Sequence, residues 1–279
     1  MVFESFREAV RLLRQMTVLW IPGGVGGLLL ALIWLLYHFT GAFFTGRLII
    51  LFGLLLLVFI VGMLVVLRER QGDLRALISG GIRYYFRVLL PFLVIIFTIA
   101  VAFMLLIVTL GFAGITPDPQ TLSIIFLCVI IPVLMLTYFF DLAAVVEDQK
   151  VFAAVQRSAS LVSANVMEVV GFFIMTALAG FAVIFGLMMV WEIALINQLE
   201  PLMNYTETQM AALTPGDLLA LIGPEGIWVT AAVLFVGGLI LIPLLFTYKA
   251  CYYQKLAGHT SPEQKITGEY DSKGRWYKY

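Results

Sequence analysis

Residues 48–67 read LIILFGLLLLVFIVGMLVVL, twenty residues without a charged side chain between Arg47 and Arg68. As an α-helix this stretch is about 30 Å long, because a helix rises about 1.5 Å per residue. That length equals the thickness of the hydrocarbon core of a bilayer, which is about 30 Å. The stretch therefore predicts a helix that crosses a membrane, with an arginine at each end.

The whole chain has the same apolar character. Of its 279 residues 62% are hydrophobic and 12% are charged, the mean hydropathy is +1.03, and the net charge is zero. A soluble globular domain averages about 45–50% apolar and about 25% charged residues. One soluble core of this length does not bury so much apolar surface, which excludes a cytosolic enzyme, a nucleic-acid-binding protein and a secreted disulfide scaffold.

Windows of about 20 apolar residues locate six segments long enough to cross the bilayer. They are residues 18–39, 48–67, 88–113, 122–146, 169–191 and 227–247. The sequence lacks the alternating segments of about ten residues that form membrane barrels, so the fold class is all-α. We expect a polytopic membrane helical bundle over residues 1–253 and a polar cytoplasmic tail over residues 254–279.

Basic residues gather on one side of these segments, and only Arg47 lies on the other side. The sixteen that share a side are Arg7, Arg11, Arg14, Arg68, Arg70, Arg75, Arg83, Arg87, Lys150, Arg157, Lys249, Lys255, Lys265, Lys273, Arg275 and Lys278. Cytoplasmic loops carry an excess of Lys and Arg, so this asymmetry predicts a multi-pass protein of the cell membrane with both termini in the cytoplasm. Residues 192–226, which carry five acidic residues and no basic one, are expected outside. Tyr248, Tyr252 and Tyr253 are expected at the inner membrane interface.

An amphipathic stretch precedes the first, third and fifth segments, at residues 5–16, 73–85 and 148–165. One interpretation is a threefold repeat of an interfacial helix followed by two spans; the other is that short amphipathic linkers occur in any multi-span protein. Asp73 and Asp148 are candidate N-caps. Helices of this kind lie in the headgroup plane with their basic side chains toward phosphates. The residues expected to contact lipid headgroups are Arg7, Arg11, Arg75, Arg83 and Lys150. In the long outer loop, short helices are expected near residues 206–213 and 218–222.

A search for chemistry finds little. The two histidines and the two cysteines lie in different parts of the predicted topology, and metalloprotease, hydrolase and nucleotide-binding motifs are missing from the sequence. We therefore expect no catalytic, cofactor-binding or metal-ligating residue and no enzymatic activity. The expected partners are membrane lipids and another membrane protein, and no nucleic acid.

Asp141 is the exception, because it lies between Phe140 and Leu142 inside an apolar run. A carboxylate in hydrocarbon is expensive and is by default a functional candidate, here as a proton or cation relay. The structural alternative is that it caps a neighbouring helix end or pairs with an inner arginine. The glycines of residues 23–27 have two similar interpretations, a broken helix lining a cavity or close helix packing. Pro132 and Pro243 are expected to kink their helices.

Residues 140–162 read FDLAAVVEDQKVFAAVQRSASLV. This stretch resembles a broad group of prokaryotic six-span membrane proteins of unknown function, which includes the membrane domain attached to some glycerophosphodiester phosphodiesterases. In that group a span ends in an apolar run, followed by an acidic turn and an amphipathic helix with an Arg-Ser pair. The matching residues here are 145–146, 147–148 and the pair Arg157 and Ser158. The 26 residues after Tyr253 leave no room for the phosphodiesterase domain, so that activity is not expected.

The leading functional interpretation is a non-catalytic integral membrane protein, a scaffold or a lipid-interacting component. The alternative is a small transporter or channel for a lipid-like or small solute that uses Asp141. The candidate functional polar residues are Asp141, Arg157 and Ser158. A polar cavity that reaches Asp141 would favour transport.

Overall fold

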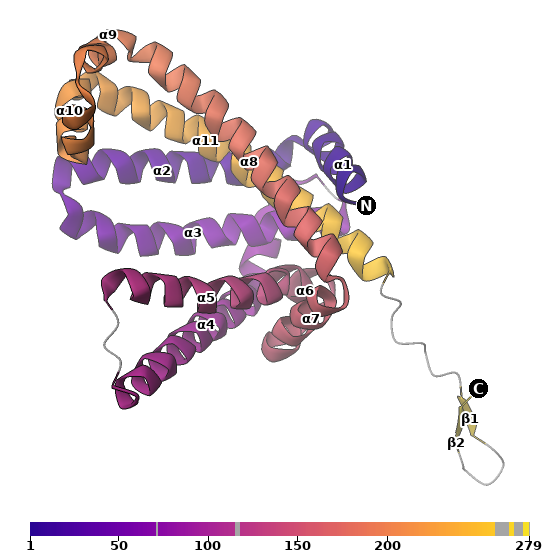
Figure 1. The fold of residues 1–279 in the computed structure, drawn as a ribbon. Helices are drawn as coiled ribbons and strands as arrows, with labels where there is room; N and C mark the ends of the chain where they lie inside the picture. The colour runs from indigo at the N-terminus through magenta and orange to yellow at the C-terminus, as the bar shows by residue number, and fades with distance from the viewer. Residues whose placement is uncertain (71, 115–117, 260–267, 271–275, 279) are drawn as a thin grey trace.

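Long helices make up nearly all of the computed structural model (Figure 1), which describes residues 1–70, 72–114, 118–259, 268–270 and 276–278. The long elements are η1 (Thr17–Trp20) with α2 (Ile21–Thr40), α3 (Ala42–Glu69), α4 (Leu74–Phe112), α5 (Pro119–Thr137), α8 (Val166–Ala194) and α11 (Pro215–His259). The shorter ones are α1 (Val2–Gln15), α6 (Phe140–Val146), α7 (Val151–Ala164), α9 (Ile196–Leu199), η2 (Glu200–Asn204) and α10 (Glu207–Ala212). In the tail, where no strand is predicted, β1 (Gly268–Tyr270) pairs antiparallel with β2 (Trp276–Lys278).

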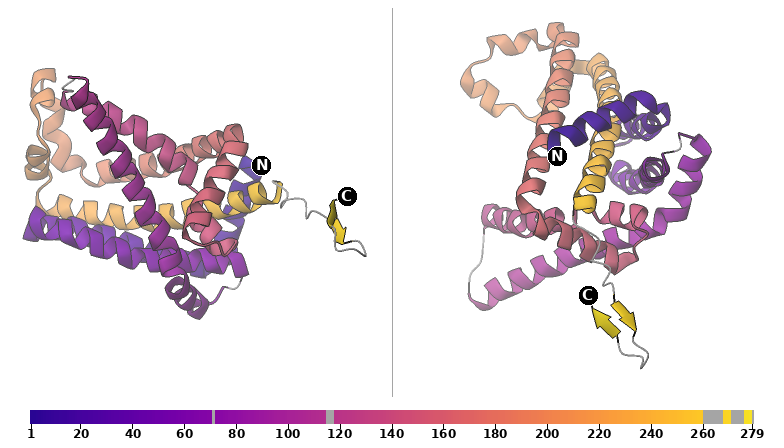
Figure 2. Two further views of the ribbon diagram at one scale, coloured as in Figure 1. Left: turned by 90° about the horizontal axis from the view of Figure 1, so that it is seen from below. Right: turned by 90° about the vertical axis from the view of Figure 1, so that its right-hand side faces the viewer.

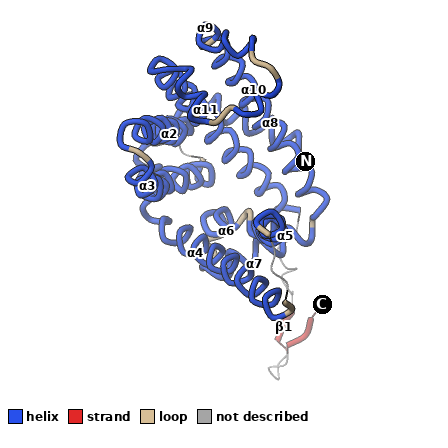
Figure 3. The backbone as a smooth tube through the Cα atoms, turned by 60° about the vertical axis from the view of Figure 1, so that its left-hand side comes forward, coloured by secondary structure: helices blue, strands red, loops and turns tan. Residues whose placement is uncertain are grey.

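Six helical segments are long and apolar enough to cross a membrane, as predicted. They are Thr17–Thr40, Phe43–Glu69, Leu74–Phe112, Pro119–Val146, Val166–Ala194 and Gly216–Gly258. The helices α2, α3, α8 and α11 lie on one side of the molecule, and α4 to α7 lie on the other (Figure 3). The helix α4 crosses the others obliquely, which is clearest in the left-hand view of Figure 2.

Glycines let α2 and α11 approach closely. A Cβ atom at Gly27 would overlap the carbonyl oxygen of Phe235, and one at Gly23 would overlap that of Leu239. The run of residues 23–27 is helical throughout, so close packing explains it and the broken-helix interpretation is wrong. The same device occurs where α3 meets α4, because a Cβ at Gly62 would overlap the carbonyl oxygen of Leu77. Small residues at these crossings bring the helix backbones into contact.

The N-terminus and the last turns of α11 lie at the same end of the bundle, opposite α9 and α10 (Figure 1). At this end α1 crosses α8 and α11 (Figure 2, right) and contacts both. We call it the basic end, and define it by α1, α6, α7, the C-terminal turns of α3 and α11 and the N-terminal turns of α4 and α8. Most of the fully buried side chains lie here, among them Phe139, Phe172, Tyr248, Tyr252 and Tyr253.

The three predicted amphipathic stretches do not form three equivalent helices. The first and third are separate helices, α1 and α7, because Met16 and Asn165 leave the helical conformation. The second is the first third of α4, which runs on for 39 residues without a break. No residue between Tyr85 and Val88 interrupts α4, so the second amphipathic stretch is not a separate helix as the threefold repeat requires. Asp73 caps α4 as predicted, accepting a hydrogen bond from the backbone N–H of Arg75.

The ends of three other predicted segments differ from the structure. The fourth predicted span is not one continuous helix, because α5 ends at Thr137 and α6 begins at Phe140. The break does not occur at Pro132, which lies inside α5. Asp148 does not cap α7; its φ is 57° and the N-cap is Lys150. The sixth span continues to His259, beyond the predicted start of the tail.

Three tyrosines expected at the inner membrane interface are buried against other parts of the protein. Tyr248, Tyr252 and Tyr253 are each 0% exposed, so other protein side chains and not lipid surround them. Of the predicted tail, Lys265, Lys273 and Arg275 lie outside the described residues.

Both predicted short helices are present, one between α8 and α11 and one as the first turns of α11. The first is α10, whose N-cap Thr206 forms a capping box with Gln209. The second begins at Pro215, and Gly223 interrupts it with a φ of 61°, a conformation that glycine adopts readily. The chain then continues directly into the sixth span.

Candidate functional site around α6

One hydroxyl group hydrogen-bonds to the backbone on both sides of the break between α5 and α6. The Ser158 hydroxyl, on α7, donates to the carbonyl oxygen of Leu136 at 2.9 Å and accepts from the backbone N–H of Phe139 at 3.0 Å. Backbone groups at helix ends need such partners, since an unpaired buried amide is destabilising. Ser158 is fully buried. It therefore lets the fourth span end early and turn into the short, buried helix α6.

Asp141 lies in the first turn of α6 and pairs with Lys249 of α11. Its Oδ2 lies 2.7 Å from Lys249 Nζ, and the two residues are 5% and 6% exposed. Its Oδ1 accepts from the backbone N–H of Leu142 at 2.9 Å. The ring centroid of Tyr138 lies 4.3 Å from the ammonium group, which is cation–π distance. Asp141 is thus neutralised by a lysine from a sequence-distant helix, where the structural alternative named an arginine or a helix end.

Glu147, just after α6, joins Arg157 to the same cluster. Its carboxylate accepts from Arg157 Nε at 2.9 Å and from the Tyr253 hydroxyl at 2.7 Å. Burial acts to lower the pKa of the Arg157 guanidinium, but the hydrogen bond and negative charge of Glu147 outweigh it and raise that pKa. Arg157 therefore stays charged at every physiological pH and ties α7 to the end of α6.

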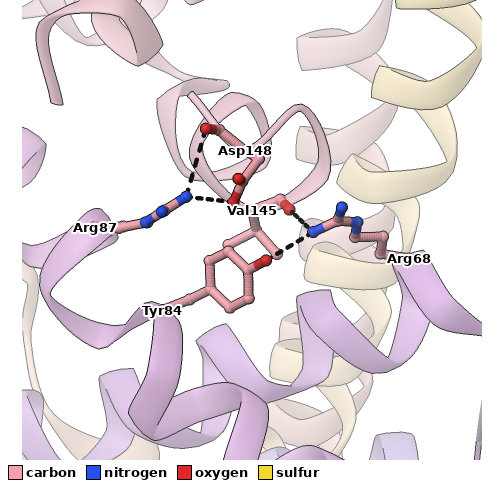
Figure 4. Close-up of polar contacts among 5 residues, drawn as sticks. All are labelled: Arg68, Tyr84, Arg87, Val145 and Asp148. Atoms are coloured by element: carbon pink, nitrogen blue, oxygen red, sulfur yellow. Dashed lines mark hydrogen bonds and ion pairs between the residues drawn. The ribbon is translucent and has the colours of Figure 1, made fainter. Parts of the chain in front are cut away.

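Two arginines hold the opposite side of α6 (Figure 4). Arg87 of α4 pairs with the carboxylate of Asp148. Arg68, at the end of α3, donates to the Tyr84 hydroxyl at 2.9 Å and to the carbonyl oxygen of Val145 at 2.8 Å. Val145 is in the last turn of α6, whose carbonyl groups lack helical partners and favour a cation. Basic residues from α3, α4, α7 and α11 therefore all contact α6 or the two acidic residues that follow it.

Asp141 and Lys249 also line the end of a groove between α3, α4 and α5. The groove has a volume of about 710 Å³. Its walls are formed mainly by aliphatic side chains of α3 and α4, and its polar side chains are Thr137, Tyr138, Asp141 and Lys249. These four lie together, so the groove is polar at one end and apolar along the rest of its length.

The residues predicted to contact lipid headgroups lie elsewhere on the basic end. All five are exposed: Arg7, Arg11, Arg75, Arg83 and Lys150. Arg7 and Arg11 border a shallow depression on α1 of about 650 Å³, together with Arg14, Phe3 and Phe6. The structure brings Asp141, Arg157 and Ser158 together around α6, but it does not bring the headgroup residues into that cluster.

The partners of these residues are not predicted by the sequence. The apolar run of the sixth segment ends at residue 247, which predicts Lys249 in the cytoplasmic flank. The signal that could have found it is the apolar and aromatic character of residues 250–253, which continues beyond the lysine. Glu147 and Arg68 carry no such signal, because their roles depend on which helices meet.

No group of three or more histidine, cysteine, aspartate or glutamate side chains suited to a metal occurs in the described part of the chain. Cys128 is exposed and Cys251 is buried, and neither is in a disulfide.

A family model described as domain of unknown function (DUF7847) matches residues 1–256. The comparison with curated proteins and the comparison with solved structures found no match. The resemblance of residues 140–162 to membrane domains attached to glycerophosphodiester phosphodiesterases stays a prediction.

Proposed function

The chain belongs to the family described as domain of unknown function (DUF7847), and from that premise we propose that it is a non-catalytic membrane protein whose basic end binds anionic lipid headgroups. The proposal rests on which charges of α1 are paired: among the described residues its acidic side chains have ion-pair partners and its arginines have none. It assigns no reaction to the cluster around α6, whose charged groups are largely paired with one another.

The acidic side chains of α1 form ion pairs with other parts of the protein, although the side chain of Glu4 is itself 74% exposed. Glu8 lies 3.7 Å from Arg70 and 3.4 Å from Lys255, and Glu4 lies 3.9 Å from Lys255. The arginines of α1, at positions 7, 11 and 14, are exposed and form no ion pair with the residues that the structure describes. They border a depression beside Phe3, which is 75% exposed. This division is the observation that carries the proposal.

An arginine-rich face beside exposed aromatic side chains suits a membrane interface. Such helices lie with their apolar residues at the headgroup boundary and their cations toward phosphates. Each basic residue near an anionic surface contributes about 1 kcal/mol of attraction. Arg75, Arg83 and Lys150 would extend the same contact over α4 and α7. The predicted orientation places this end in the cytoplasm.

The lipid that co-purifies with the protein tests the proposal. The protein is reconstituted with equal amounts of phosphatidylglycerol and phosphatidylcholine, extracted in mild detergent, and its retained lipid is quantified by mass spectrometry. We expect phosphatidylglycerol to be enriched, and the enrichment to fall when Arg7, Arg11 and Arg14 are all replaced by glutamine. The matched control is Arg47→Gln, in the outer turns of α3, which should leave the enrichment unchanged. Equal retention of both lipids by the original protein would overturn the proposal.

The predicted orientation has its own test. Single cysteines are introduced as Gln15→Cys on α1 and Asn197→Cys on α9, both exposed positions, in a Cys128→Ser, Cys251→Ala background. A membrane-impermeant maleimide added to intact cells should label only the cysteine at position 197. Labelling of the cysteine at position 15 alone would reverse the orientation, and the headgroup proposal would then concern the outer leaflet.

Transport of a lipid-like solute is the second candidate, because Asp141 lines the end of the groove. The pairing with Lys249 counts against a free proton or cation relay, since the carboxylate would have to leave its lysine at each cycle. In reconstituted vesicles, Asp141→Asn should leave solute flux unchanged. A flux that is present in the original protein and absent in this variant would favour transport instead.

A further inference from the structure

The groove between α3 and α4 has the length of one lipid chain. On α3 it extends from Ile50 to Leu64, and on α4 from Val88 to Ile99. At about 1.5 Å per residue these segments are about 21 Å and about 16 Å long. One leaflet of a bilayer is about 15 Å of hydrocarbon, half of a core of about 30 Å. The apolar part of the groove therefore matches a single extended chain in one leaflet.

The polar end of the groove carries no net charge, because Asp141 and Lys249 neutralise each other. An ammonium group has three N–H donors. One is directed to Asp141, and the Tyr138 ring lies against the same ammonium group. The structure gives Lys249 no further acceptor among the described residues. The end of the groove therefore offers a hydrogen-bond donor beside a neutral ion pair.

We propose that this groove holds the hydrocarbon chain of an uncharged amphiphile, whose hydroxyl or carbonyl group accepts a hydrogen bond from Lys249. A charged head is disfavoured, because a third charge beside the buried pair would remain uncompensated away from water. The groove lies within the segments long and apolar enough to cross a membrane. In a bilayer, lipid chains would surround these segments. A chain from the bilayer can thus enter from the side.

Gly53 offers a way to fill the groove without disturbing the fold. It lines the groove on α3, and a Cβ added there has no heavy atom within 4 Å. Gly180 on α8 is equally open but lies outside the groove. The variants Gly53→Phe and Gly180→Phe are therefore matched in chemistry and differ in whether they obstruct the groove.

The experiment uses photoreactive lipids on the full-length protein in vesicles. The probes are hexadecanol and hexadecanoic acid, each with a diazirine on its chain, at a pH where the acid is ionised. We expect saturable labelling of peptides from α3 and α4 by the alcohol and weaker labelling by the acid. Gly53→Phe should lose the saturable labelling, and Gly180→Phe should retain it.

A third variant tests whether the head group of the ligand lies beside Asp141 and Lys249. Asp141→Asn keeps a hydrogen-bond acceptor for Lys249 but leaves the ammonium charge unbalanced, so the preference should reverse in favour of the acid. Labelling that is unsaturable, or equal in Gly53→Phe and Gly180→Phe, would overturn the site. Stronger labelling of the original protein by the acid, or an unchanged preference in Asp141→Asn, would overturn the uncharged head. Cross-links between two copies of the chain at the groove would show a protein occupant and also overturn the proposal.

Discussion

Replacing Lys249 by methionine removes the cation that faces Asp141 and leaves an aspartate that is 5% exposed without a charged partner. Breaking a buried ion pair from one side destabilises a protein by about 3–5 kcal/mol, because the remaining charge stays desolvated. The lost cation–π contact with Tyr138 adds about 0.5–2 kcal/mol. Against a total stability of about 5–15 kcal/mol, this is a large fraction.

The double variant Asp141→Leu, Lys249→Met should recover most of that loss. Replacing both members of a buried pair by apolar residues of similar size is often neutral or even stabilising. Asp141→Leu alone should be milder than Lys249→Met, because the long lysine side chain can extend its ammonium group toward water while its stem stays buried. The expected order of stability therefore places Lys249→Met lowest of the four proteins.

The buried thiol of Cys251 can be used to measure unfolding. Its thiol is buried at 3% exposure, whereas Cys128 is exposed. In a Cys128→Ala background, a thiol-reactive dye reports thermal unfolding in detergent through Cys251. A double-mutant cycle should yield a coupling free energy of about 3 kcal/mol or more between positions 141 and 249. The reasoning is refuted if Lys249→Met costs less than about 1 kcal/mol, or if the losses of the two single variants simply add.

Three further expectations follow from particular contacts. Ser158→Ala should destabilise the protein by about 1–3 kcal/mol, because it leaves the buried N–H of Phe139 without its acceptor; Ser160→Ala, an exposed position on the same helix, should change little in the same dye assay. Gly27→Ala should lower the free energy of unfolding by about 1–3 kcal/mol, because its Cβ would overlap the carbonyl oxygen of Phe235. Gly24→Ala is the control: the nearest heavy atom to its Cβ is 3.9 Å away, so it should be neutral or stabilising in thermal unfolding. At Asp118, the N-cap of α5, the backbone N–H of Thr121 donates to the carboxylate and lowers its pKa below 3.8. The cap should therefore be intact at neutral pH and lost only as the pH falls below that value. Faster amide exchange in the first turn of α5 on acidification to pH 5 would contradict this.

Most of the span layout could be predicted because it depends on local composition. A run such as residues 48–67 has few stable alternatives to a membrane helix, and α3 covers it as Ala42–Glu69. The N-cap at Asp73 and the helix near residues 206–213 were equally local, since side-chain capping involves residues only a few positions apart. The separate interfacial helix expected at residues 73–85 was wrong, because an amphipathic pattern does not show where a helix ends.

The candidate site was predicted in part. Asp141 was selected because an isolated carboxylate in an apolar run requires a partner, and Arg157 and Ser158 because the stretch that contains them resembles a group of membrane proteins. Their partners were not predicted. Lys249 lies 108 positions from Asp141, and no periodicity or motif connects the two. Ser158 explains the break after Thr137 only once α7 is placed against it.

By itself the sequence determined that the chain is helical, that six segments are apolar enough to cross a membrane, and that most of its basic residues flank the same ends of those segments. These properties follow from the length and polarity of continuous stretches, so neighbouring residues contain all the necessary information. Only the tertiary structure decided that Lys249 is a buried partner of Asp141, that residues 23–27 are a packing surface, and that the α3–α4 face contains a groove. Each of these depends on how close two distant helices come, and that distance is set by the side chains of both.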